Sequence, residues 1–272
     1  MEKLEADIVI VGTGASGLFA ALHVPNDKKV LMLTKSDVEN SDSFLAQGGI
    51  CVLRDKNDFD SFMEDTMKAG HYENRKESVE IMINSSRDII NELIGYGVDF
   101  ATKDGKLDYT REGAHSKPRI LFHEDITGKE ITSTLLDVVR KLENVTIMEY
   151  VTMTDIIEKD NVCYGVLAKD ANNNEMSIEA GYTIFACGGI GGLYDHSTNY
   201  PHLTGDAIAI AIQHGIKLEN VDYVQIHPTT LYTKKKGRAF LISESVRGEG
   251  AKLYGKGGKR FANEVLPRDI MT

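Results

Sequence analysis

Three glycines near the start of the chain, Gly12, Gly14 and Gly17, have the spacing of a turn that binds a pyrophosphate. The first glycine permits a tight turn, the second lets the backbone approach the pyrophosphate, and the third lets a helix pack closely on a strand. The free amides at the start of that helix would then bind the negative charge. The turn therefore predicts a dinucleotide site formed by Gly12, Thr13, Gly14, Ala15, Ser16 and Gly17.

The elements around this turn follow the order of a βαβ unit. A β-branched run at residues 8–11 precedes the glycines, a helical pattern at 18–23 follows them, and a second apolar strand is expected at 30–33. The position after the second strand usually carries an acid that binds ribose hydroxyls. Thr34 and Lys35 stand there instead, which argues against a generic NAD enzyme. Both are candidates for holding an adenosine ribose or phosphate, and a solvated Lys35 is the alternative.

Later segments carry polar residues suited to a small charged substrate. Glu112 lies in the run Thr-Arg-Glu-Gly-Ala-His-Ser, where its carboxylate either pairs with an ammonium group or belongs to a surface loop. His227, two residues after Gln225, either donates to a carboxylate or is a structural turn residue before a proline. Arg268, which is selected by the family resemblance described below, either holds a carboxylate through two parallel bonds or forms an ordinary ion pair.

Bulk composition excludes several classes of function. The 272 residues carry a formal net charge of −10, which disfavours nucleic acid as a partner. The basic cluster at residues 234–236 is expected to be a solvated loop. The three cysteines are far apart and form no CxxC pair, which argues against disulfides or zinc and fits a cytoplasmic location. No stretch has transmembrane length and no signal peptide is evident, so no membrane association is expected.

The rest of the pattern predicts a mixed α/β chain. Residues 36–56 show no period and are expected to form a long functional loop. Asp58 is expected to cap a helix that ends at Gly70. Further helices are expected at 77–94, 130–142 and 206–214, strands at 145–148 and 184–186, and a three-stranded antiparallel meander at 151–180.

Five segments, in order along the chain, resemble the succinate dehydrogenase/fumarate reductase flavoprotein superfamily, and within it the L-aspartate oxidases. They are residues 41–49, 110–116, 225–229, 243–250 and 260–269. The resemblance implies an α/β fold, with a Rossmann-like FAD-binding domain and its β-meander at 1–220 and the start of an α+β capping domain at 221–272. Chains of that family continue well beyond this length, so we expect a truncated chain that is inactive by itself.

The same resemblance implies FAD as the cofactor. The matching flavin loop comprises Asp42, Ser43, Phe44, Leu45, Ala46, Gln47, Gly48 and Gly49. In the respiratory members of the superfamily a histidine of this loop bonds covalently to FAD, and Asp42 stands at that position here. A carboxylate cannot form that linkage, so noncovalent FAD is expected. Asp206, which follows Thr-Gly, resembles a family residue near the ribitol or the pyrophosphate.

The resemblance also implies a reaction. It is the FAD-dependent oxidation of L-aspartate to iminoaspartate, with oxygen or fumarate as acceptor, in de novo NAD biosynthesis, where quinolinate synthase would act downstream. Respiratory succinate dehydrogenases carry an apolar aromatic residue where Glu112 stands, whereas L-aspartate oxidases carry glutamate. A carboxylate there can pair with the α-ammonium that succinate lacks.

The site residues carried over from this resemblance fall into two groups. Those expected to handle the proton are Arg268, Glu244 and Arg247, and those expected to bind the substrate are Glu112, His227, Gln225 and Ser243. Two alternatives stay open. One is a soluble flavoprotein of the fumarate reductase or succinate dehydrogenase type, which Glu112 argues against. The other is an inactive flavin-binding fragment.

Overall fold

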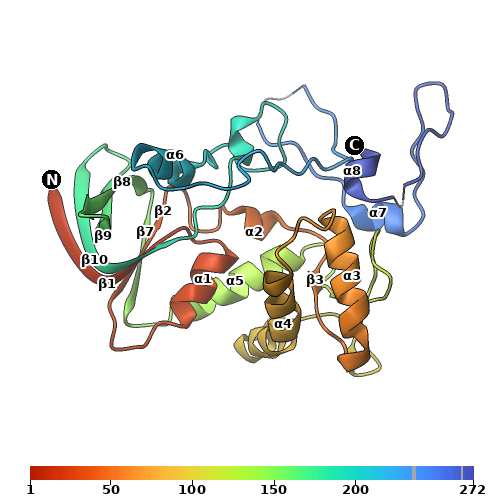
Figure 1. Ribbon diagram of the computed structural model, residues 1–272, viewed down its shortest axis with the longest axis horizontal. Coiled ribbons are helices and arrows are strands. Elements are labelled where there is room, and N and C mark those ends of the chain that lie inside the picture. The colour runs from red at the N-terminus through yellow and green to blue at the C-terminus, as the bar shows by residue number, and fades with distance from the viewer. Residues whose placement is uncertain (235–236, 265) are drawn as a thin grey trace. The chain divides into compact units, whose positions relative to one another are not determined.

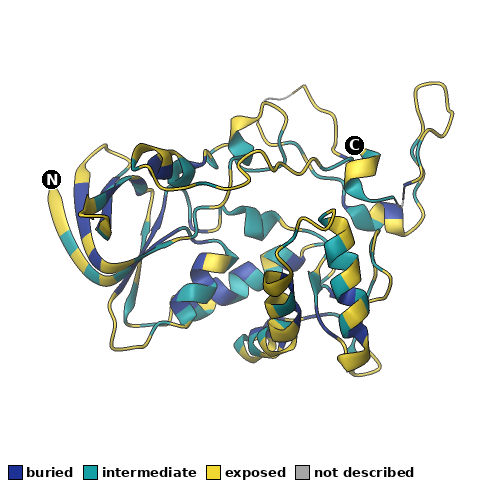
Figure 2. Cartoon of the chain, in the orientation of Figure 1, coloured by how far each residue is buried: buried dark blue, intermediate teal, exposed yellow. Residues whose placement is uncertain are grey.

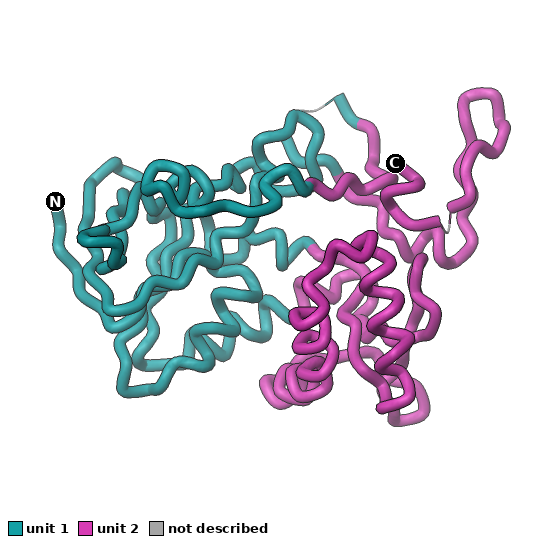
Figure 3. Tube along the Cα trace, in the orientation of Figure 1, with its two compact units in different colours: residues 1–45, 131–223, 233–239 teal, residues 46–130, 224–232, 240–272 magenta. Residues whose placement is uncertain are grey.

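The structure, a computed structural model, describes residues 1–234, 237–264 and 266–272. These residues form two compact units (Figure 3). Unit 1 comprises Met1–Leu45, Ile131–Tyr223 and Thr233–Ala239, and unit 2 comprises Ala46–Glu130, Val224–Tyr232 and Phe240–Thr272. The expected division into domains at residue 220 stays a prediction. Within the basic cluster at 234–236, Lys235 and Lys236 lie outside the described residues.

Unit 1 is built on a six-stranded mixed sheet (Figure 1). Its strands lie in the order β7, β2, β1, β10, β9, β8. Their bounds are β1 Glu2–Val11, β2 Val30–Thr34, β7 Val145–Glu149, β8 Thr152–Lys159, β9 Val162–Lys169 and β10 Glu175–Phe185. The first four strands of this order run parallel, and β9 pairs antiparallel with β10 and β8. The predicted α/β class, with a meander joined to a parallel sheet, is confirmed.

Burial explains the sequence pattern of the central strands. Every residue of β2 and the last three residues of β1 are buried, because both faces of an inner parallel strand are covered. Figure 2 shows this buried centre in dark blue. Val9, Leu33, Val166 and Ile178 belong to one hydrophobic cluster, which therefore joins the parallel strands to the meander.

Strand β10 corrects one expectation. The sequence predicted a last meander strand and a separate buried strand at 184–186, but Glu175–Phe185 is one continuous strand of 11 residues. It pairs antiparallel with β9 from Glu175 to Glu179 and parallel with β1 over almost its whole length. A local pattern divides at Gly181, whereas the partner strand β1 holds both halves in one register.

The helices of unit 1 are displaced by a few residues from their expected positions. Helix α1, Ala15–Leu22, packs on β1 and begins earlier than predicted, and α6, Asp206–Gln213, packs on β8 (Figure 1). Helix α5, Thr127–Val139, begins in unit 2 and continues into unit 1. The segment expected as a loop contains a short helix α2, Asp42–Leu45. None of the described helices is long and apolar enough to cross a membrane.

Unit 2 contains two packed helices and several short elements. Helices α3, Phe59–Ala69, and α4, Lys76–Tyr96, pack on each other over a small core that includes Phe62 and Ile83. Gly97, with φ of 106°, ends α4 in the left-handed conformation that glycine favours. The short elements are β3 Ile50–Cys51, β4 Thr102–Lys103, β5 Lys106–Leu107, β6 Ile120–Leu121, α7 Glu244–Gly248 and α8 Arg268–Met271.

A buried ion cluster around Arg119 joins α3 to the segment before β6. Arg119 is fully buried and donates to Asp58 at 3.2 and 3.0 Å from its Nε and one terminal nitrogen, and to Asp65 from the other. Burial alone would raise the pKa of both acids, but the hydrogen bonds from Arg119 and from Ser61 or Ser116 outweigh it and hold each pKa below its usual value. Asp58 precedes α3 as predicted, yet its side chain bonds Arg119 instead of capping the helix.

We predict that Arg119→Met lowers the free energy of unfolding by about 3–5 kcal/mol, because the buried Asp58 and the partly buried Asp65 lose the guanidinium that binds both. The pKa values of Asp58 and Asp65 are lowered in the folded state. Their contribution to stability is therefore complete above about pH 4 and is lost as the pH falls through the lowered values. That acid-dependent loss should be absent from the variant, and urea unfolding at several pH values measures both effects.

The matched control is Arg140→Met, because Arg140 is half exposed and its nearest acid, Asp137, is 3.9 Å away. A surface pair of this kind contributes less than about 1 kcal/mol. Equal losses of stability in the two variants would show that the Arg119 cluster is no more important than a surface pair.

Candidate functional site

A pocket of about 430 Å³ lies in unit 1 at the carboxyl ends of β1, β2 and β10. Open parallel sheets bind ligands at this edge. The predicted cofactor residues that line it are Gly12, Thr13, Gly14, Ser16, Thr34, Lys35, Asp42, Ser43 and Asp206. Val151, Met153 and His202, which no local sequence signal marks, reach the same pocket from distant segments.

The glycine turn has no space for side chains. Gly12 has φ of 116°, and a Cβ added there would lie 2.1 Å from the carbonyl oxygen of Ala186. A Cβ on Gly17 would lie 2.1 Å from the carbonyl oxygen of Gly12. Helix α1 begins directly after Gly14 and has no acidic residue in its first turn. Its positive end is therefore left to attract an anion such as a pyrophosphate.

Two residues of the predicted flavin loop have defined partners in unit 1. The Ser43 hydroxyl accepts the amide of Ala15 at 3.1 Å, which places it beside the start of α1. The Asp42 carboxylate accepts the side-chain amide of Asn199 and the backbone amide of Tyr200. Burial raises the pKa of Asp42, while these hydrogen bonds oppose the increase. Asp42 is thus a hydrogen-bond acceptor whose position is fixed by Asn199 and Tyr200.

The acid missing after β2 is supplied by a distant segment. Lys35 Nζ lies 2.7 Å from Asp206 and 2.9 Å from the Thr204 hydroxyl, and its side chain is 23% exposed. Lys35 is therefore paired, which corrects the alternative of a solvated side chain. Asp206, at the start of α6, neutralises Lys35 and lines the pocket together with Thr34.

The remaining flavin-loop residues, Ala46, Gln47, Gly48 and Gly49, belong to unit 2. Gly48 has φ of 66°, and a Cβ there would lie 2.7 Å from Glu112 Oε1. A Cβ on Gly49 would lie 2.2 Å from the carbonyl oxygen of Leu121. The loop backbone therefore approaches Glu112 and the end of β6 closely. Phe44 and Leu45 lie in the short helix α2 of unit 1 and do not line the pocket.

Unit 2 brings the predicted substrate and proton-handling residues together. Arg268 donates from Nε to Glu244 at 2.6 Å and from a terminal nitrogen to Gln225 at 2.8 Å. Arg247 lies 3.5 Å from the same Glu244 carboxylate. These four residues come from segments as far apart as 225 and 268. They form one polar group in which Arg268 is hydrogen-bonded to Glu244 and Gln225, and Arg247 is ion-paired with Glu244.

Arg247 is buried, with 3% of its side chain exposed. One terminal nitrogen donates to the carbonyl of Glu264 at 3.1 Å. Its Nε and its other terminal nitrogen are buried without a hydrogen-bond partner among the described residues. Unsatisfied buried donors are rare in native proteins, so these two point to a ligand or to further protein groups as partners.

The charges of this group affect the pKa values of Glu112 and His227. Burial raises the pKa of Glu112, the nearby Glu244 carboxylate adds to the increase, and Arg268 opposes it. Burial lowers the pKa of His227, which favours the neutral imidazole, and its Nδ1 lies 2.9 Å from the carbonyl of Thr229. Arg268 and Arg247 also act to lower the His227 pKa.

Ser243 has a different partner from the one expected. Its hydroxyl donates to Asp125 at 2.7 Å and accepts the amide of Ser245 at 3.3 Å, so it caps the start of α7. Asp125 was not identified from the sequence, since a single acid between two predicted elements gives no local signal. In this arrangement the Ser243 hydroxyl already donates its proton to Asp125, so a substrate carboxylate would have to compete with Asp125 for that hydrogen bond.

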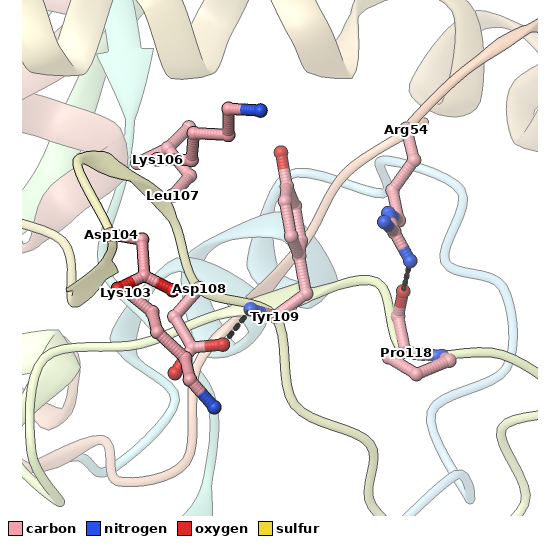
Figure 4. Close-up of a pocket in the computed structure, with 8 residues that line it drawn as sticks. All are labelled: Arg54, Lys103, Asp104, Lys106, Leu107, Asp108, Tyr109 and Pro118. Atoms are coloured by element: carbon pink, nitrogen blue, oxygen red, sulfur yellow. Dashed lines mark hydrogen bonds between the residues drawn. The ribbon is translucent and has the colours of Figure 1, made fainter.

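A second hollow in unit 2, of about 450 Å³, contains none of the predicted site residues. Figure 4 shows its lining side chains, among them Arg54, Lys106 and Tyr109. The Arg54 guanidinium stacks 4.6 Å above the Tyr109 ring and donates to the carbonyl of Pro118 at 3.1 Å. These groups are already engaged with one another, so we assign no ligand to this hollow.

Comparison with known proteins identifies a family. A family model described as FAD binding domain matches residues 7–272. The L-aspartate oxidase of Clostridium perfringens is 46% identical over 271 residues, and that of Clostridium acetobutylicum is 46% identical over 272 residues. Each match covers 99% of this chain and 62% of the relative. The chain thus spans about three fifths of the length of these curated relatives.

Solved structures give the same fold. A quinol fumarate reductase of E. coli matches with a TM-score of 0.91 at 26% identity, covering 100% of this chain and 50% of that one. Sdh1 of Mycobacterium smegmatis matches with a TM-score of 0.85 at 30% identity, covering 99% of this chain and 49% of that one. The family match and these flavoprotein folds identify the cofactor as FAD.

We predict that Gly12→Ala lowers the free energy of unfolding by about 2 kcal/mol or more and abolishes FAD retention, because its Cβ overlaps a carbonyl that cannot move away. The control is Gly95→Ala in α4, where an added Cβ meets nothing within 4 Å. That variant should keep FAD and gain up to about 1 kcal/mol of stability. Urea unfolding and flavin absorbance measure both variants, and a Gly12→Ala protein that retains FAD would contradict the steric argument.

Proposed function

The chain belongs to the FAD binding domain family, and on that premise we propose that its protein oxidises L-aspartate to iminoaspartate. Bound FAD supplies the two-electron acceptor for such an oxidation. The glycine turn and the first turn of α1 would hold its pyrophosphate, Thr34 would hold its adenosine portion, and Asp206 would lie near the ribitol or the pyrophosphate. Asp42 would accept hydrogen bonds and form no covalent link to the flavin.

One observation supports aspartate most strongly: unit 2 contains both a carboxylate, Glu112, and a guanidinium, Arg268, among its predicted substrate and proton-handling residues. Glu112 is half-buried, and the positive charge of Arg268 lowers its pKa against the larger effects of burial and Glu244. A zwitterionic dicarboxylate offers an ammonium to Glu112 and a carboxylate to Arg268. Succinate offers no ammonium, so the half-buried charge of Glu112 would have no substrate partner.

The remaining residues of the group have roles that follow from their contacts. Glu244 fixes the Arg268 fork through its Nε, and Gln225 fixes one terminal nitrogen, so the guanidinium has little rotational freedom. The two nitrogens of Arg247 that lack a hydrogen bond among the described residues, together with the imidazole of His227, would bind the second carboxylate. The Glu244 carboxylate, which is ion-paired with Arg247 and Arg268, would take up the proton released from the substrate ammonium.

We place this reaction in NAD biosynthesis, with oxygen or fumarate as the final acceptor and quinolinate synthase as the enzyme that uses the product. The clostridial relatives that are 46% identical are L-aspartate oxidases, which supports the substrate. A cytoplasmic location fits three free cysteines. The rival function is a fumarate reductase, which is supported by the fold match at a TM-score of 0.91.

The first prediction is that FAD is bound without a covalent bond, since Asp42 replaces the linking histidine expected from the resemblance. After precipitation of the holoprotein with acid, the yellow flavin should remain in the supernatant. Flavin that sediments with the denatured protein would show a covalent link through another residue.

The second prediction tests the substrate in the native protein that contains this chain. L-Aspartate should reduce the bound flavin in the absence of oxygen, and succinate should reduce it far less. Glu112→Gln removes the charge at nearly constant shape, so the ratio of aspartate to succinate efficiency should fall by about ten- to a hundredfold, the effect of losing a charge-assisted hydrogen bond.

The same ratio should fall with decreasing pH in the wild-type protein, because protonation removes the Glu112 charge. The raised pKa of Glu112 moves this loss to higher pH than for an ordinary glutamate. The Gln variant, which cannot titrate there, should lack this pH dependence. Equal losses for both substrates in the variant would make Glu112 a structural residue, and preferred reduction by succinate in the wild type would favour the fumarate reductase.

A further inference from the structure

A short segment at the start of α5, residues 125–128, holds the backbone of the predicted flavin loop in unit 2. The Thr127 hydroxyl donates to the carbonyl of Gly48 at 2.7 Å, and the amide of Gly128 donates to the carbonyl of Ala46 at 2.9 Å. Asp125 Oδ1 accepts the amide of Gly48 in a longer contact of 3.4 Å. All three contacts reach backbone atoms, so they fix the path of the loop whatever its side chains are.

Asp125 has a second partner on the same oxygen. The Ser243 hydroxyl donates to Oδ1 at 2.7 Å, and Ser243 is 5% exposed. A hydroxyl has one proton, and an ionised carboxylate accepts hydrogen bonds only, so the direction of this bond is fixed. With its proton directed at Asp125, Ser243 presents a lone pair to the amide of Ser245 and caps α7.

Helix α7 carries the proposed proton-handling group. Glu244 is its first residue and holds Arg268 at 2.6 Å. A continuous series of contacts therefore runs from Gly48 through Asp125 and Ser243 to Glu244 and Arg268. Every member belongs to unit 2, although the segments lie far apart in the chain.

We propose that Asp125 is a positioning residue that ties the flavin loop at residues 46–48 to the substrate segment that begins at Ser243, an inference that rests on the proposed function. Asp125 holds Ser243 in the orientation that caps α7, and through it sets the direction of Glu244 and of the Arg268 fork. The bond is short and involves a charged acceptor, which makes it one of the stronger hydrogen bonds of the site.

Three variants of the native protein separate this role from a merely structural one. Asp125→Ala removes the acceptor, Asp125→Asn keeps an oxygen acceptor at nearly constant shape, and Ser243→Ala removes the donor. The control is Glu124→Gln, an exposed acid next to Asp125 whose side chain has no role in these contacts. Circular dichroism melts establish that each variant is folded.

The main readout is binding of succinate to the FAD-loaded protein, followed as a change in flavin absorbance without turnover. Succinate affinity should fall about tenfold or more in Asp125→Ala and stay within about threefold of wild type in Asp125→Asn and Glu124→Gln. FAD affinity, measured by flavin fluorescence, should also fall in Asp125→Ala alone. The double variant Asp125→Ala/Ser243→Ala should bind succinate no more weakly than Asp125→Ala, because that single variant already removes the bond between Asp125 and Ser243.

Unchanged succinate and FAD affinity in a folded Asp125→Ala protein would overturn the proposal. So would an Asp125→Asn protein as impaired as Asp125→Ala, or additive losses in the double variant, which would mean that Ser243 contacts the succinate independently of Asp125. These measurements need no oxidation of L-aspartate. A wild-type protein that binds succinate but does not oxidise aspartate would therefore overturn the proposed function and leave the test of Asp125 intact.

Discussion

The close approach of two backbone segments at the end of β1 is the constraint on which unit 1 depends. Gly12 leaves the sheet with φ of 116° and passes so near the carbonyl of Ala186 that no side chain fits between them. Ala186 follows directly after β10, which runs parallel to β1 over almost its whole length. The long register of these two strands thus sets the contact, and the contact directs the start of α1 into the pocket.

Two buried arginines of unit 2 show how satisfied donors distinguish a structural residue from a functional one. Arg119 is fully buried, and its Nε and both terminal nitrogens donate to acids. Arg247 is buried almost as completely, but among the described residues its Nε has no hydrogen-bond partner, and one terminal nitrogen has only an ion-pair contact of 3.5 Å with Glu244. Because an unpaired buried donor costs free energy, the first arrangement is complete as it stands and the second is complete only with a further group.

The charged group that contains Arg268 also depends on two uncharged polar residues, Gln225 and Ser243. Gln225 holds one nitrogen of the guanidinium, and Ser243 caps the helix that carries Glu244. Asp125 then fixes the Ser243 hydroxyl. The positions of the charged side chains are thus set by hydrogen bonds from neighbouring residues. Such support is usual where a site must hold a small ligand in one orientation.

The sequence by itself determined the features that depend on local chemistry. The glycine spacing predicted the turn, the β-branched run predicted a buried strand, and the order of five segments predicted the FAD-binding fold. Glu112, Glu244 and Arg268 were chosen by residue type and by resemblance, and the structure brings them into one group.

Only the tertiary structure decided what depends on partners distant in the chain. It joined the two predicted strands into β10, because β1 lies beside both halves. It paired Lys35 with Asp206 across 171 positions and Ser243 with Asp125 across 118. A polar side chain is solvated, caps a helix or binds a ligand according to which other group lies within hydrogen-bond distance of it. Folding alone sets that distance, and no spacing within one segment of the sequence records it.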